Sequence, residues 1–210
     1  MNFTYLTTVQ RDVLKEIGNI GAGNAATSMS KLLDKKIDMQ VPNVNVVDFD
    51  EMMDMIGGHE QLITALFFRI EGEAPGTVYF ILSVEEAQHL VGAITKQSGY
   101  RLLGENFDEM AVSALQETGN ILTSAYLSAL SDFTNLNMQP SIPYLSIDMA
   151  GAILTAGIVE LSQVTDYAII INTRINHHDS KKDIQGNFFL IPDPATLEKL
   201  YVSLGINDHE

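Results

Sequence analysis

The amino-acid sequence repeats itself, and this repeat limits the possible folds more than any other feature. Shifting the chain by 101 positions aligns "LKEIGNIGAGNAA", which begins at Leu14, with "LQETGNILTSAYL", which begins at Leu115. Seven positions from Asp12 to Pro42 are identical to their counterparts, where ordinary composition gives roughly two. The identical pairs are Leu14/Leu115, Glu16/Glu117, Gly18/Gly119, Asn19/Asn120, Ile20/Ile121, Ser30/Ser131 and Pro42/Pro143. Two internal repeats, approximately 1–105 and 106–210, therefore predict pseudo-twofold symmetry.

Both repeats predict the same order of elements: a long helix, a strand, a short helix, two strands and a closing helix. Thr7 and Gln10 can form a capping box that opens a helix running to about Leu33. In the second repeat Asn106 is the expected cap, with Glu109 three residues later. The other expected segments are extended chain ending near the two prolines, short helices at about 50–56 and 149–155, strands at 63–72, 76–83, 167–175 and 186–191, and closing helices at 85–94 and 195–204.

These elements predict an α/β fold with α+β-like layers. No linker rich in serine, glycine or proline separates the repeats, so we expect a single domain over residues 1–210. The chain is 46% hydrophobic, which is enough to build a substantial core. We expect about six mostly antiparallel strands in one shared sheet, flanked by helices, with the repeated motif on the two long helices.

Charge and composition narrow the possible partners. The formal net charge of −15 argues against binding to nucleic acid or to an anionic membrane. The chain has no cysteine, which excludes disulfides and thiolate metal sites. It shows neither an apolar run of about 18 residues, as a membrane span needs, nor a secretory signal. We therefore expect a cytoplasmic protein, and a monomer because an internal pseudo-dimer has less need to pair again.

The first copy of the motif places three glycines inside its predicted helix. Each costs roughly 1 kcal/mol relative to alanine, so Gly18, Gly21 and Gly23 need a reason. One explanation is close packing against the sheet or another helix, which would also apply to Gly119. "GAGNAA" matches a dinucleotide-binding fingerprint, but that fingerprint follows a strand, and here an amphipathic helix precedes it. We expect no thermal stabilisation by nucleotides.

The glutamate and asparagine that flank the repeated glycine are the candidate functional residues. Glu16 and Asn19 are three residues apart, as are Glu117 and Asn120, so each pair shares one helical face. Asparagine is a poor helix former because its amide competes for backbone hydrogen bonds. A helix that accepts Gly-Asn twice is predicted to present a polar, uncrowded face to a partner. The alternative is a solvated helix face with a chance match.

The chemistry open to this face is limited. It carries neither a strong nucleophile nor a partnered histidine, and it has too few ligands for a metal site of its own. An amide both donates and accepts hydrogen bonds, so it can orient a water molecule. Positioning of this kind is most of what phosphoryl transfer requires. The carboxylate could pair with a lysine on a partner that already holds the phosphate and a magnesium ion.

The spacing resembles that of a known family. The pattern [Asp/Ser]-x-x-x-Glu-x-x-Asn, with proline after 22 further residues, is similar to the signature of the CheC/CheX/FliY phosphatases, which dephosphorylate the chemotaxis response regulator CheY. Asp12, Glu16, Asn19 and Pro42 form one copy, and Ser113, Glu117, Asn120 and Pro143 form the other. CheX-like proteins are shorter with one intact motif, and FliY-like proteins carry an additional domain, so the length and both motifs resemble the CheC-like members.

This resemblance implies a protein aspartyl-phosphate phosphatase, a hydrolase of two-component signalling. Asn19 and Asn120 would orient the attacking water, and Glu16 and Glu117 would engage the regulator. The supporting residues would be Asp12 and Ser113, on the helix or docking contact, and Pro42 and Pro143, which would fix the neighbouring strand. The protein would need no cofactor of its own, because Mg²⁺ would be held by CheY.

The resemblance also implies a second partner, the receptor-modifying deamidase CheD, which would stimulate the phosphatase. The stretch from Ser146 to Val164 is similar to the segment of the family that contacts CheD, and Asp148 would lie in that contact. The alternative function is mainly non-catalytic: an adaptor that binds CheD or the flagellar switch and CheY-phosphate. We expect the two motif copies to be unequal, because Asp12 is replaced by Ser113 and the first copy has extra glycines.

Overall fold

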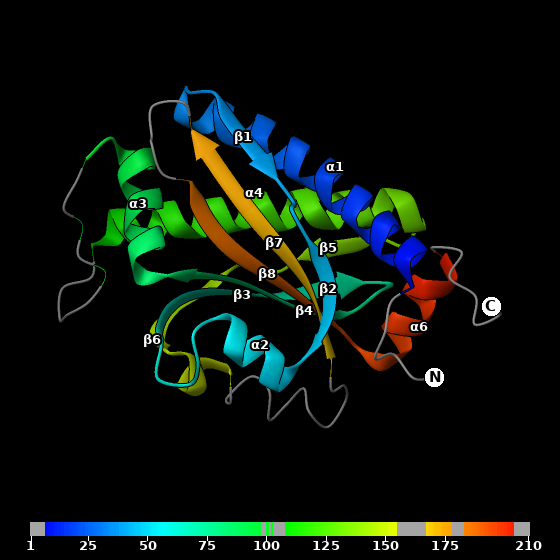
Figure 1. The fold of residues 1–210 in the computed structure, drawn as a ribbon. Coiled ribbons are helices and arrows are strands. Elements are labelled where there is room, and N and C mark those ends of the chain that lie inside the picture. Colours follow the sequence, from blue (N-terminus) through cyan, green and yellow to red (C-terminus); the bar gives the residue numbers. More distant parts are fainter. Residues whose placement is uncertain are drawn as a thin grey trace.

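The computed structural model describes residues 7–97, 100, 102, 108–154, 167–177 and 183–203. Within these residues one antiparallel sheet carries two long helices on one face and short helical segments on the other (Figure 1). Every strand pairing recorded in the sheet is antiparallel. The predicted fold class, helices flanking a shared antiparallel sheet, is confirmed.

The two long helices are α1 (Thr8–Leu33) and α4 (Glu109–Thr134), each of 26 residues and related by the 101-residue offset. The predicted capping box is present, because Thr7 and Gln10 each accept a hydrogen bond from the other's backbone N–H. The cap predicted for the second helix is wrong. Asp108 caps α4 by accepting a hydrogen bond from the N–H of Met110, and Asn106 lies outside the described residues.

Each predicted extended segment is divided into two strands near its proline. β1 (Ile37–Gln40) and β2 (Val44–Asp48) both pair with β7 (Tyr167–His177), and β5 (Met138–Pro140) and β6 (Tyr144–Met149) both pair with β3 (Leu62–Gly72). Over the described residues the sheet thus has eight strands rather than about six. Proline lacks the N–H donor that a continuous ladder needs, so pairing breaks in a bulge at both places.

The edges of the sheet are exchanged between the sequence repeats. β3 forms a hairpin with β4 (Gly76–Ser83), and β7 forms one with β8 (Ile184–Pro192), in the order β1-β7-β8-β4-β3-β5. The edge strands β1 and β2 of the first repeat therefore lie on the hairpin of the second, and β5 and β6 lie on the hairpin of the first. Phe80 of β4 faces Phe188 of β8 at the centre, on the pseudo-twofold axis.

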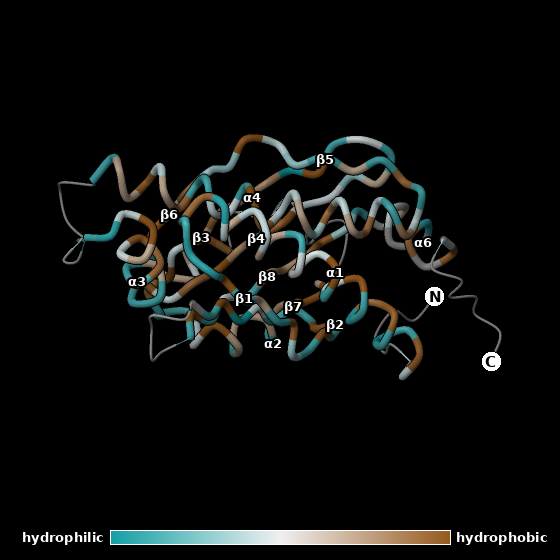
Figure 2. Tube along the Cα trace, turned by 90° about the horizontal axis from the view of Figure 1, so that it is seen from above, coloured by the Kyte–Doolittle hydropathy of each residue, from teal (hydrophilic) through white to brown (hydrophobic). Residues whose placement is uncertain are grey.

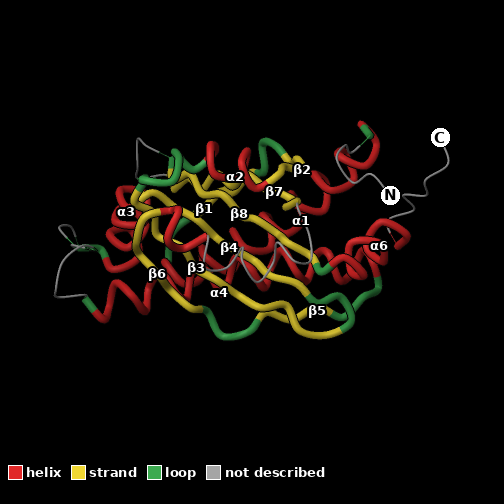
Figure 3. The backbone as a smooth tube through the Cα atoms, turned by 90° about the horizontal axis from the view of Figure 1, so that it is seen from below, coloured by secondary structure: helices red, strands yellow, loops and turns green. Residues whose placement is uncertain are grey.

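Alternation along the strands builds two hydrophobic cores, one on each face of the sheet. Figure 2 colours the chain by the hydropathy of each residue, and Figure 3 distinguishes the helices from the strands. The larger core lies between the sheet and α1, α4 and α3 (Val84–Thr95), and includes Leu66 and Phe68. The smaller includes Ile63 and Ala65, which point to the other face, and is covered by α2 (Phe49–Met55) and the helical residues 150–154. The closing helix α6 (Pro194–Ser203) contacts α4 and β8.

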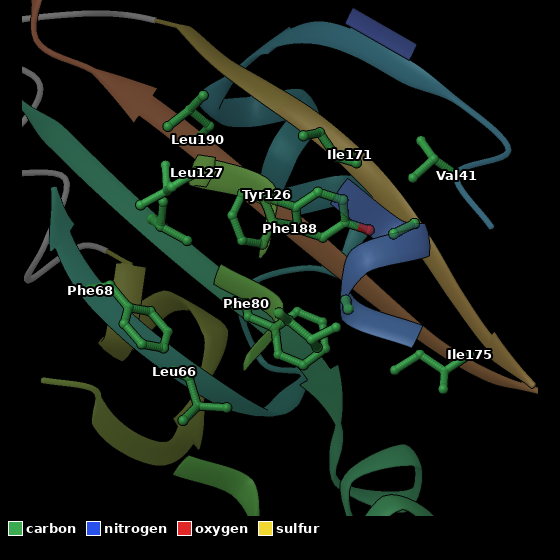
Figure 4. Close-up of a cluster of buried hydrophobic side chains, with 14 of the residues drawn as sticks. Val41, Leu66, Phe68, Phe80, Tyr126, Leu127, Ile171, Ile175, Phe188 and Leu190 are labelled. Atoms are coloured by element: carbon green, nitrogen blue, oxygen red, sulfur yellow. The ribbon is translucent and has the colours of Figure 1, made fainter. Parts of the chain in front are cut away.

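Tyr126 of α4 lies at the centre of the larger core, where its ring centroid is 4.8 Å from that of Phe188 (Figure 4). Its hydroxyl is 2.9 Å from Oγ1 of Thr173, so the buried phenol is hydrogen-bonded. Burial disfavours the phenolate and raises the pKa of Tyr126 to about 12, although the hydrogen bond to Thr173 opposes the shift. Tyr126 therefore joins α4 to the sheet through both an aromatic contact and a hydrogen bond.

Candidate functional site

The motif residues of the first copy lie on the outer face of α1. Asp12, Glu16 and Asn19 are exposed, whereas Leu14 and Ile17 between them are buried against the sheet. This separation follows from the helical period, because residues three and four apart share a face. The carboxylate and the amide are thus both within reach of a partner protein.

The second copy lies in the same way on α4. Ser113 and Glu117 are exposed and Asn120 is half-buried, while Leu115 and Gly119 are buried beneath them. The predicted common face of each Glu-Asn pair is therefore present in the structure, and the two asparagines differ in exposure.

The glycines next to the two asparagines are packing residues. A Cβ atom at Gly18 would lie 3.3 Å from Cγ1 of Val41, and one at Gly119 would lie 3.1 Å from Cδ2 of Leu66 and 3.3 Å from Cζ of Phe68. Both helices therefore lie so close to the side chains beneath them that a Cβ atom would require those side chains to shift by a few tenths of an ångström. The glycines leave room on the sheet side of the helix, not beside the amide.

The two further glycines of α1 have different surroundings. A Cβ atom at Gly21 would lie 2.6 Å from Cδ1 and 3.0 Å from Cα of Tyr126, so α1 and α4 touch there. Gly23 is exposed and has no neighbour within 4 Å of the equivalent position. The packing explanation is confirmed for Gly21 and wrong for Gly23. Since both lie in the middle of a helix, the strand-turn-helix context of a dinucleotide site is missing.

In the first copy the asparagine is bonded to the proline loop. Oδ1 of Asn19 accepts a hydrogen bond of 3.3 Å from the backbone N–H of Val41, the residue before Pro42. Val41 is buried and Pro42 is exposed. The bond is long for an N–H···O contact, so it holds the amide oxygen of Asn19 only weakly.

In the second copy the corresponding loop forms one wall of a surface cleft of about 430 Å³. The other wall is α4. The cleft brings together four residues predicted from the motif, Ser113, Glu117, Asn120 and Pro143. Four further lining residues were missed: Gln116, Pro140, Ser141 and Ile142. Gln116 was detectable, because it is three residues after Ser113 and four before Asn120 and so shares their helical face.

Hydrogen bonds hold this loop in place. Nε2 of Gln116 donates to the carbonyl of Pro143 at 3.4 Å. The backbone N–H of Ser141 donates to the carbonyl of Arg69 at 2.8 Å, and the N–H of Arg69 donates to Oγ of Ser141 at 3.0 Å. The loop is thus tied both to the motif helix and to β3.

The predicted CheD-contact residue lies elsewhere on the molecule. Asp148 is exposed on β6, opposite Ile63 of β3, and its Oδ1 accepts a hydrogen bond from the N–H of Met149. It lines a separate cleft of about 330 Å³ with Phe67, Tyr79 and Tyr144, among other residues. Aromatic side chains line part of this second cleft, whereas the cleft at Glu117 and Asn120 exposes polar and apolar atoms about equally.

The described side chains at the motif offer an amide, a carboxylate and hydroxyl groups. Among the described residues no three histidine, aspartate or glutamate side chains come together as a metal site. Such a face can bind a cation through its carboxylate and orient water through its amide.

Comparison with known proteins shows which family has this arrangement of motifs. The model of the CheC-like family matches residues 9–46 and 110–147, two segments separated by the same 101 positions as the repeat. The CheY-P phosphatase CheC of Bacillus subtilis (strain 168) is 39% identical over 203 residues, which are 97% of each chain. The chain belongs to the CheC-like family.

Membership of the CheC-like family confirms the resemblance seen in the sequence and supports a phosphatase. A second relative, the putative CheY-P phosphatase CheC1 of Halobacterium salinarum, is 23% identical over 184 residues, 86% of this chain and 88% of that one. The crystal structure of Thermotoga maritima FliY has the same fold, with a TM-score of 0.71 at 20% identity over 95% of this chain and 98% of that chain. No helix in the described part of the chain is long and apolar enough to cross a membrane.

Proposed function

We propose that this CheC-like protein hydrolyses the aspartyl phosphate of the chemotaxis response regulator CheY. One observation carries the proposal. Both long helices present a glutamate and an asparagine on an accessible face beside a proline loop. They do so in a chain that is 39% identical to a CheY-P phosphatase.

The proposed reaction needs positioning more than acid or base catalysis, because an acyl phosphate is already labile. A water oxygen attacks phosphorus, and the bond between phosphorus and the aspartate oxygen breaks. Its electron pair stays on the aspartate carboxylate, and the protons of the water leave with phosphate and solvent. Asn19 or Asn120 orients the water through its amide. Glu16 or Glu117 pairs with a cationic side chain of CheY, and CheY itself holds the Mg²⁺.

The two copies are proposed to act separately and unequally, with the second as the faster site. The amide of Asn120 lies in an open cleft, whereas the oxygen of Asn19 is already bonded to the N–H of Val41. That bond has to be released, or the water has to be held by the amide nitrogen alone. Since this hydrogen bond is long and therefore weak, we expect it to lower the rate of hydrolysis at the first site without abolishing it.

The test is the rate of acyl-phosphate loss from phosphorylated CheY with Mg²⁺ present. The variants are Asn19→Ala, Asn120→Ala and the double variant, with Asn24→Ala as a control, because Asn24 is an exposed asparagine of α1 outside the motif. We expect the double variant to lose about 100-fold of the accelerated rate, Asn120→Ala to lose more than Asn19→Ala, and Asn24→Ala to match wild type. Equal losses from the two single variants would refute the inequality. A wild-type protein that does not accelerate the loss of acyl phosphate would refute the proposed phosphatase activity.

A second candidate function, binding of CheD, is favoured by the aromatic cleft at Asp148. Tyr144 is 69% exposed at this cleft, and Phe67 and Tyr79 are in edge-to-face contact at 5.2 Å. Such a surface, with a carboxylate at its edge, fits a protein partner. Under the adaptor alternative, this contact would be the main activity and turnover of CheY-phosphate would be weak or absent.

Titration with CheD distinguishes these functions. Asp148→Asn is expected to weaken CheD binding and to remove stimulation of the phosphatase, while the unstimulated rate stays unchanged. Asp132→Asn, a change at an exposed carboxylate near the end of α4, serves as the control. If CheD binds the Asp148→Asn variant as it binds wild type, the contact is elsewhere.

A further inference from the structure

The residue before the proline adopts opposite positions in the two copies. Val41 is 2% exposed, whereas Ile142, its counterpart at the 101-residue offset, is 89% exposed. An isoleucine side chain this exposed contributes no hydrophobic stabilisation to the fold. Its exposure therefore needs a structural cause, and it leaves the side chain available to a partner.

The cause is that side chains of different size fill the equivalent places in the two halves of the core. The edge strands are paired in equivalent register, Val44 with Ile171 and Leu145 with Leu66, so the hairpin strands correspond at an offset of 105 and Phe68 corresponds to Thr173. Phe68 packs under Gly119, 3.3 Å from the position of a Cβ atom, whereas Val41 packs under Gly18. The phenyl ring takes the space that a buried Ile142 would need. Figure 4 shows Val41 and Phe68 at opposite sides of the larger core.

The exposed side chain is carried by a fixed loop. Ile142 lies between Ser141, which is hydrogen-bonded to Arg69, and Pro143, whose carbonyl accepts from Gln116. The strand also ends one residue earlier here, at Pro140, because Oγ of Ser141 takes the N–H of Arg69. An apolar side chain on a fixed loop loses little conformational entropy when a partner covers it.

Ile142 lines the same cleft as Glu117 and Asn120. We propose that Ile142 is an apolar docking anchor for the phosphorylated response regulator, specific to the second site; this inference rests on the proposed function. A regulator that places its phosphoryl group at Asn120 covers Ile142 as well, and it finds no equivalent at the first site, where Val41 is buried. The anchor adds affinity for the regulator, not speed to the chemical step.

The experiment isolates the second site in a Glu16→Arg/Asn19→Ala background. There Ile142→Ser is compared with Ile142→Leu and with Val202→Ser, a change at a valine of α6 that is 60% exposed. Two quantities are measured: the Kd for CheY activated by beryllofluoride and Mg²⁺, and KM and kcat for CheY-phosphate. We expect Ile142→Ser to raise Kd and KM by about tenfold or more, since burial of an isoleucine in an interface supports at least that change. The kcat should stay within about twofold.

The controls decide between the possible failures. Ile142→Leu is expected to keep Kd near that of the background, and Val202→Ser to leave Kd and KM unchanged. If Ile142→Ser leaves Kd and KM unchanged while turnover persists, the anchor is refuted and the proposed phosphatase stands. If the wild-type chain shows no turnover, the phosphatase fails, and the Kd values alone then decide whether Ile142 contacts the activated regulator.

Discussion

At the scale of single residues, Gly21 and Gly23 of α1 differ in the room that each leaves for a methyl group. Gly23→Ala is expected to raise the free energy of unfolding by about 0.5–1 kcal/mol, because alanine is the better helix former and no atom lies within 4 Å of the new Cβ. Gly21→Ala is expected to lower it by about 1–3 kcal/mol, because the Cβ would overlap Tyr126. Urea denaturation of both variants measures the difference. Changes of the same sign would contradict the packing described here.

Tyr126 predicts an alkaline dependence of stability. Its pKa is 10.0 when unperturbed and about 12 in the folded protein, so folding favours the neutral phenol. This stabilisation is complete below pH 10 and is lost as the pH rises through 12, by about 1.4 kcal/mol per unit.

Comparison with Tyr126→Phe between pH 8 and pH 11.5 isolates that contribution, because the other tyrosines are common to both proteins. Wild type should begin more stable, by about 1 kcal/mol for the lost hydrogen bond to Thr173. Its advantage should shrink and then reverse as the phenol of unfolded chains ionises. Parallel stability curves for the two proteins would show that Tyr126 does not titrate differently on folding.

The exposure of Glu16, Asn19 and Glu117 could be predicted from sequence, because helical spacing alone determines it. The position of Ile142 could not. It depends on the large side chain of Phe68, whose counterpart in the other repeat is the smaller Thr173. Phe68 comes close to the loop only because β3 pairs with β5 and β6. Close packing could be predicted for Gly21, but its packing partner could not, since Tyr126 belongs to the other repeat.

At the scale of elements, the capping box predicts how firmly the motif helix begins. Thr7→Ala removes the acceptor of the Gln10 N–H and should lower the free energy of unfolding by about 1 kcal/mol. Thr8→Ala, at the next residue and inside the helix, is the matched control and should change it little. Amide hydrogen exchange should be faster in the first turn of α1 in Thr7→Ala alone. Equal exchange in both variants would mean that the cap does not secure Asp12.

Most elements were predictable because their patterns are local. β4 spans Gly76–Ser83 as expected, and α1 ends at Leu33 as expected. The division of each extended segment into two strands could not be predicted, because it depends on how the segment pairs with its partner strand. Three residues of one strand lie opposite two of its partner at the proline, and this cannot be recognised before the partner is known.

At the scale of the whole molecule, the exchanged edges predict that neither repeat folds as a monomer on its own. Fragment 1–105 lacks β7 for its edge strands, and fragment 106–210 lacks β3. Each fragment alone should show poorly dispersed amide resonances, and an equimolar mixture should recover the spectrum of the intact chain. The intact chain should unfold in one transition. A fragment that folds cooperatively as a monomer would contradict this interdependence.

The exchange itself was beyond prediction from the sequence. The two extended segments have similar patterns, and each could pair with the hairpin of its own repeat or with that of the other. Sequence similarity between the repeats makes these alternatives almost equal in local preference. In the structure α1 packs against α4, with Gly21 against Tyr126, and this contact joins the two repeats on the helical side of the sheet.

The exchanged edges also determine when the strands can pair during synthesis. β1 and β2 are complete when Asp48 has been added, but their partner β7 begins at Tyr167, 119 positions later. At about 5–20 residues per second, a ribosome takes roughly 6 to 24 s to make that interval. Throughout it, Val44 and Val47 have no strand beside them, and the nascent chain carries an open edge. The edge strands in the N-terminal third of this protein therefore cannot pair until the C-terminal third has been made. Slow translation prolongs the period in which these unpaired strands can aggregate.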